Sequence, residues 1–148
     1  MKTDELFKHW NEVRKGLIEA LDKLTNAQLD FVPRQGLWSL RETMVHIAGT
    51  EQGWLRYYSA NRWHENEPKA GDYPTIESLK ALLAQEHAIT EAQFTADPEA
   101  AMERVCPLPW GAQVTMGWVV WHVIEHEIHH RGEIYLMLGL MGMEAPDV

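Results

Sequence analysis

The sequence predicts an all-α protein, a four-helix bundle in which residues 1–148 form a single domain. Three observations lead to this class. Four segments repeat apolar residues at helical spacing, polar or proline-containing stretches separate them, and 45% of the 148 residues are apolar. A chain of this length can bury roughly 70% of its unfolded surface in one core. A short β-hairpin-like excursion is expected before the last helix.

The first helix is expected over about residues 3–24. Its apolar positions fall three or four apart on one face, and they are Leu6, Trp10, Val13, Leu17, Leu21 and Leu24. Thr25 and Gln28 match a capping box, in which the two residues bond each other's backbone, so a further short turn should begin there. Pro33 should end that turn.

The second helix should start at another capping box, formed by Ser39 and Glu42. Its apolar stripe extends as far as Tyr58, and the helical pattern fades near Asn61. Residues 62–74 are polar and contain helix breakers, so we expect a connecting loop there.

Thr75 should cap the third helix, which is expected to run to about Ala96 and to end at Asp97-Pro98. Two short strands joined by a turn are expected within residues 99–114. Thr115 should then cap the last helix, over about residues 116–141, and the tail 143–148 should be loose.

The charge balance excludes several partners. The net charge is -9, from 13 basic and 22 acidic residues, and the basic residues form no patch, so we expect no nucleic-acid partner and no membrane surface. No apolar run of about eighteen residues predicts a membrane span. Cys106 is the single cysteine, and charges interrupt the first 25 residues, which favours a cytoplasmic protein without a signal peptide.

Four of the eight histidines lie in the last predicted helix, at positions 122, 126, 129 and 130. Residues four apart on a helix can direct their imidazoles toward one point, as in zinc sites with two histidines on one helix. Spacing alone leaves three pairs open, 122/126, 126/129 and 126/130, and an ordinary polar helix face is the alternative. A third ligand must come from another helix, where His46 is the best candidate and His9 a weaker one.

The chain also resembles a known family. The segment 126–134, His-Glu-Ile-His-His-Arg-Gly-Glu-Ile, is similar to the H-x-x-x-H-R-G-Q-I signature of DinB/YfiT-like proteins. Residues 38–48, followed by Glu51 and by Trp54-Leu55, resemble the second helix of that family, and residues 24–29 match it as well. The resemblance extends over nearly the whole chain and keeps the order of the elements.

This resemblance implies a mirror variant of the up-and-down four-helix bundle and a divalent metal ion, most often zinc or nickel, held by three histidines. Carried over by position, the metal ligands are His46, His126 and His130, because the last histidine of the signature directly precedes Arg-Gly. His122 and His129 are then expected not to bind the metal, with His122 a possible supporting residue. Glu133 stands where the family often has Gln, and we expect it to be solvated.

The resemblance implies a metal-dependent enzyme that acts on a small molecule, either as a thiol S-transferase that uses a low-molecular-weight thiol or as a hydrolase. The alternative is a non-catalytic stress-response or binding module whose metal site is structural or vacant. No catalytic residue is evident from spacing, and Cys106 in its proline-rich segment is not expected to be a nucleophile. Helix bundles with exposed apolar residues often pair, so a homodimer is also expected, and a monomer is the alternative that the sequence leaves open.

Two further groups of residues are expected to have ordinary structural roles. Glu125 and Glu127 should be surface charges. Core packing, rather than the lining of a pocket, is the expected fate of five aromatic residues, which are Trp38, Trp54, Tyr57, Trp110 and Trp118.

Overall fold

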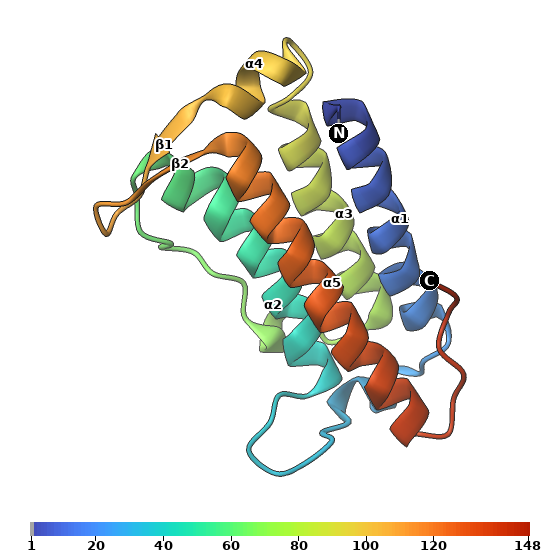
Figure 1. Ribbon diagram of the computed structural model, residues 1–148. Helices are drawn as coiled ribbons and strands as arrows, with labels where there is room; N and C mark the ends of the chain where they lie inside the picture. Colours follow the sequence, from blue (N-terminus) through green and yellow to red (C-terminus); the bar gives the residue numbers. More distant parts are fainter. Residues whose placement is uncertain (1) are drawn as a thin grey trace.

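The computed structural model describes residues 2–148, and the predicted helical bundle is confirmed (Figure 1). Its long helices are α1 (Thr3–Asp22), α2 (Leu40–Gln52), α3 (Ile76–Ala92) and α5 (Met116–Leu140). The colours of Figure 1 show that the chain runs down α1, up α2, back down along an extended connection, up α3 and down α5. Because α1 and α2 each pack against both α3 and α5, α1 and α2 occupy opposite corners of the bundle.

The predicted N-terminal caps are confirmed for three of these helices. Ser39 accepts a hydrogen bond from the Glu42 backbone N–H, and its own N–H donates to the Glu42 carboxylate. Hydroxyl groups likewise cap α3, through Thr75, and α5, through Thr115. These side chains bond N–H groups that the first turn of a helix leaves without partners.

The segment between α3 and α5 differs from the prediction. Helix α3 ends at Ala92 rather than near Ala96, and a short helix α4 (Pro98–Glu103) follows that was not predicted. Asp97 caps α4 and Pro98 opens it, because proline lacks the N–H that the first turn would leave unbonded. The Asp97-Pro98 pair therefore starts α4 and does not end α3, which stops five residues earlier.

The hairpin-like excursion before the last helix is confirmed. Strands β1 (Val105–Pro107) and β2 (Gln113–Thr115) pair antiparallel, with Val105 opposite Thr115. Cys106 lies fully buried in β1, and burial raises the pKa of its thiol. A buried thiol with a raised pKa is a poor nucleophile, in keeping with the expectation for Cys106.

Helix α2 does not continue regularly to Asn61 as predicted. A π-helical turn, η2 (Gly53–Tyr57), follows it, then a 3-10 turn, η3 (Tyr58–Ala60), and Asn61 ends the segment with a left-handed backbone at φ 57°. A side chain at Gly53 would lie 2.9 Å from Nδ1 of His64, so only glycine allows His64 to pack there. Further 3-10 turns are η1 (Asn26–Asp30) and η4 (Ala70–Asp72).

The C-terminal tail is more firmly attached than predicted. The Met143 N–H donates to the Leu138 carbonyl at 2.9 Å, and Met143 and Ala145 pack against the core. The expectation of a loose tail was therefore wrong for its first residues. It holds at the end, where Val148 is 95% exposed.

A buried polar layer divides the core. One apolar cluster contains Leu17, Ile47 and Ile134, and a second contains Trp10 and Leu55 with other residues. Between them on α1 lies Arg14, whose Nε donates to Oε1 of Glu127 at 2.7 Å. Glu127 is 1% exposed, so the expectation that it is a surface charge was wrong.

Arg14 connects all four long helices. Its Nη2 donates to Glu51 of α2 at 2.8 Å and to Glu127 of α5 at 2.7 Å, and its Nη1 donates to the Leu83 carbonyl of α3 at 2.8 Å. Burial by itself would lower the pKa of Arg14, but the two carboxylates outweigh it and raise the pKa. Burial would likewise raise the pKa of Glu51, yet Arg14 and His87 hold it below its ordinary value.

None of the helices within residues 2–148 is both long enough and apolar enough to cross a membrane, as the sequence predicted.

Replacing Arg14 by Met should strongly destabilise the fold, because two buried carboxylates would lose their common partner. We expect a loss of about 3–5 kcal/mol in the free energy of unfolding, measured by urea denaturation. The control is Lys15→Met at the next position, where the side chain is 65% exposed and pairs only with Glu19. Its effect should stay below about 0.5 kcal/mol, and equal losses in the two variants would contradict the role given to Arg14.

Candidate metal centre

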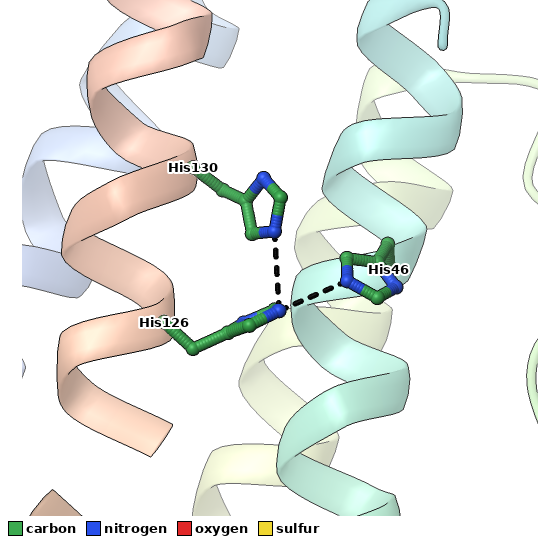
Figure 2. A group of neighbouring side chains, drawn as sticks. All are labelled: His46, His126 and His130. Atoms are coloured by element: carbon green, nitrogen blue, oxygen red, sulfur yellow. Dashed lines mark hydrogen bonds between the residues drawn. The ribbon is translucent and has the colours of Figure 1, made fainter. Parts of the chain in front are cut away.

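Three histidines from two helices meet between α2 and α5. Figure 2 shows His46 extending from α2 toward His126 and His130 of α5. The Nε2 atom of His126 lies 2.9 Å from Nε2 of His46 and 3.1 Å from Nε2 of His130. A zinc–imidazole bond is about 2.0–2.1 Å long, so nitrogens that share one ion lie roughly 3 Å apart. The structure therefore brings together the three residues predicted as ligands, in a group that could hold a metal ion.

The protons available to these rings do not account for both short contacts. The Nδ1 atom of His130 lies 2.6 Å from Oε2 of Glu133, and this contact to a carboxylate requires the proton on Nδ1. In the neutral form of this ring the Nε2 atom of His130 then carries a lone pair. Since Nε2 of His126 faces both other rings and can hold only one proton, the two contacts cannot both be normal hydrogen bonds. A cation among the three nitrogens fits this donor set.

The electrostatic setting keeps two of the rings neutral. Burial, followed by the effects of His130 and His46, lowers the pKa of His126 to about 3. Burial and His130 also lower the pKa of His46. A neutral imidazole offers a lone pair without first losing a proton, as a metal ligand must.

Glu133 supports the site, contrary to the expectation of a solvated residue. Its side chain is 43% exposed, yet one oxygen bonds His130 and the other lies 3.2 Å from Nε2 of His129. A carboxylate on the far nitrogen of a ligand histidine fixes its tautomer and orientation. The i, i+3 spacing from His130 to Glu133 was a signal that the sequence offered. The Nδ1 atom of His126 is buried and has no such partner among the described residues, so contacts at Nε2 orient that ring.

Within residues 2–148 none of the other histidines joins this group of three, although His129 forms a second group with His130 and Glu133. The His122 ring stacks on Trp118 at 4.9 Å and 7°, and within residues 2–148 no hydrogen bond joins it to the cluster. His129 and His9 are exposed. His87 bonds the buried carboxylate of Glu51 in the core.

The aromatic residues are less buried than predicted. Trp38 is 48% exposed, and its ring lies 4.5 Å from that of His46. Trp110 and Trp118 are about half exposed and gather around Trp54 beside the hairpin. Core packing was therefore the wrong expectation for these three exposed tryptophans, and Trp38 instead forms part of the wall of the histidine site.

Two cavities border the histidine cluster. The larger one, of about 460 Å³, includes Trp38, His130 and Glu133 in its lining. The smaller one, of about 250 Å³, includes His46, His126 and Thr50, whose hydroxyl lies 3.4 Å from Nε2 of His126. The cluster is thus accessible from outside the bundle, unlike a closed structural metal site.

The fold and this site define a class, a four-helix bundle with a cluster of three histidines between two of its helices. Within that class the chain belongs to the DinB family, whose sequence model matches residues 1–148. A curated relative is the uncharacterized protein YizA of Bacillus subtilis, which is 24% identical over 101 residues. That match covers 67% of this chain and 62% of YizA, so the chain spans less than two thirds of the relative's length.

Solved structures share the fold. A DinB-like protein from Bacillus cereus is 17% identical, with a TM-score of 0.75 over 98% of this chain and 96% of its own. YfiT from Bacillus subtilis is 21% identical, with a TM-score of 0.57 over 97% and 89% of the two chains. A mycothiol-dependent maleylpyruvate isomerase is 13% identical, with a TM-score of 0.67 over 90% of this chain and 61% of that chain. The predicted DinB/YfiT-like bundle is confirmed.

His126 lies at the centre of the cluster, so its replacement should remove the metal. His126→Ala, purified without a histidine tag, should contain far less than one divalent ion per chain by plasma mass spectrometry. His122→Ala should keep the metal content of the parent protein, because that ring stacks on Trp118 instead. Loss of metal in both variants would favour the 122/126 pair and contradict the assignment.

Glu133 should strengthen metal binding through His130. We expect Glu133→Ala to raise the dissociation constant of the metal by about 10- to 100-fold, measured in competition with a chromophoric chelator. Glu133→Gln keeps an oxygen that can accept the Nδ1 proton and should lose less. Glu125→Ala, an exposed acid of the same helix, is the control, and an equal effect there would mean that only net charge matters.

Proposed function

We propose that His46, His126 and His130 hold a divalent metal ion, zinc or nickel, and that the chain is an enzyme that acts on a small molecule at this site. The observation that carries the proposal is the convergence of three Nε2 atoms at the border of two accessible cavities. Three histidine ligands from two helices leave room for a further ligand, which is the arrangement of catalytic rather than structural zinc.

The bound metal would supply Lewis-acid chemistry, either lowering the pKa of water or stabilising a thiolate. The protein's own residues orient this chemistry. Glu133 fixes the tautomer of His130, and the Thr50 hydroxyl beside His126 can bond a group at the cluster. Trp38 lines the larger cavity and packs its ring 4.5 Å from that of His46.

Two reaction types are consistent with the site, hydrolysis and transfer of a low-molecular-weight thiol. The names of the structural neighbours support both. YfiT is described as a probable metal-dependent hydrolase, and the isomerase is described as mycothiol-dependent. Both reactions use a metal-activated nucleophile on an electrophilic carbon, and this chain's cluster would serve either.

A two-panel assay tests the proposal. The metal-loaded chain is given a neutral aryl ester in one panel, and in the other a thiol (bacillithiol, glutathione, cysteine or coenzyme A) with 1-chloro-2,4-dinitrobenzene. We expect turnover in one panel that requires metal and is lost in His46→Ala. His9→Ala, which changes an exposed histidine of α1, should keep full activity.

The alternative, a non-catalytic module, predicts a different result. One metal ion per chain without turnover in either panel would favour a binding or stress-response role. No stoichiometric metal, together with unchanged properties in His130→Ala, would overturn the enzyme proposal.

A further inference from the structure

The two cavities that border the histidines differ in chemistry. The larger one, called here the apolar cavity, lies between the loop before α2 and the last turns of α5, and its walls include Pro33, Leu37, Trp38, Leu136 and Met137. The smaller one, called the polar cavity, is lined by Thr50, Tyr58, His64 and Glu67 together with two of the ligand histidines. A molecule that reaches the cluster from the apolar cavity must therefore lie against an apolar wall.

The two charged residues that line these cavities are both acidic. Glu133 is the acidic residue of the apolar cavity and Glu67 that of the polar cavity. Among the described residues that line the two cavities there is no lysine and no arginine. The nearby Arg56 is paired with Glu86 and does not line either cavity. An anionic group placed in these cavities would thus lose water without gaining a cationic partner other than the metal.

The apolar wall is open where a ligand would enter. Trp38 is 48% exposed, Leu37 57% and Leu136 64%, and all three line the same cavity. The buried hydroxyl-bearing residue Thr43 and the pair His130–Glu133 are its polar groups, and they lie on the side of the cluster. Ligand pockets commonly combine an apolar wall of this kind with a few polar groups that orient the ligand.

We propose that the apolar cavity binds the apolar part of a neutral small molecule, whose polar reacting group then lies at His46, His126 and His130. This inference rests on the proposed function and narrows its substrate class to uncharged, largely apolar compounds. It also disfavours thiols that carry several carboxylates, such as glutathione or bacillithiol, as the occupant of this cavity. Trp38 lines this cavity and lies with its ring 4.5 Å from that of His46, so it would contact both parts of the molecule.

A pair of fluorescent probes with one skeleton tests the charge preference. N-phenyl-1-naphthylamine is neutral, and 1-anilinonaphthalene-8-sulfonate adds one sulfonate to the same rings. We expect the neutral probe to bind with one site per chain and the sulfonate to bind about tenfold more weakly or worse. Equal or tighter binding of the sulfonate would overturn the proposal.

Two matched variants locate the probe. Leu136→Lys replaces an apolar wall residue by a cation, so it should weaken the neutral probe and strengthen the sulfonate. Leu140→Lys makes the same change one turn further along α5, at a leucine that is 57% exposed and does not line the cavity. It should leave both affinities unchanged, and equal effects of the two variants would place the probe elsewhere and overturn the proposal.

Binding of the probe does not require catalysis, so the two proposals can fail separately. Probe binding as expected, without any metal-dependent turnover, would retain the cavity assignment and reject the enzyme. If metal-dependent turnover is found but the neutral probe does not inhibit it competitively, the enzyme proposal stands and the proposed substrate class is wrong. If the chain elutes as a dimer and does not bind the probe, a second copy covers the cavity. This result would also overturn the proposal that the apolar cavity binds a small molecule.

Discussion

The guanidinium of Arg14 is the contact on which the arrangement of the four helices depends. Among residues 2–148 it is the one group that bonds α2, α3 and α5 from α1, through Glu51, the Leu83 carbonyl and Glu127. Burying two carboxylates and one guanidinium in ionised form is costly unless their charges pair and hydrogen bond with one another. Apolar packing allows helices to slide relative to one another, whereas directional bonds to one planar group allow few registers.

This layer also sets the position of the histidine site. Glu127 directly follows His126 on α5, and it points into the core while the imidazole points toward α2. Glu51 lies five residues after His46 on α2 and is bonded by the same Arg14. Fixing Glu51 and Glu127 therefore fixes the relative height of α2 and α5, and with it the distance of 2.9 Å between His46 and His126.

Much of the fold could be predicted because local signals mark it. Ser39, Thr75 and Thr115 cap helices through bonds to residues three positions on, which sequence spacing records directly.

The features that the sequence did not predict depend on contacts between residues far apart in the chain. Nothing in the spacing of Glu127 distinguishes it from Glu125, because its burial depends on Arg14 from a helix more than a hundred residues away. The close packing of His64 on Gly53 likewise joins residues eleven positions apart, which spacing does not record. Spacing alone also left three histidine pairs open, and the family resemblance, followed by the position of His46 on the opposite helix, selected among them.

The polar layer gives the histidine cluster an independence that many small metal sites lack. In zinc fingers the ion itself assembles its ligands, so binding and folding are one event. Here α2 and α5 are already joined through Glu51, Arg14 and Glu127, behind the imidazoles. The free energy of ion binding is then not consumed in ordering the chain. Such a scaffold can release one ion and accept another while remaining folded, so the supply of ions around the protein, rather than its folding history, would decide which ion the cluster carries.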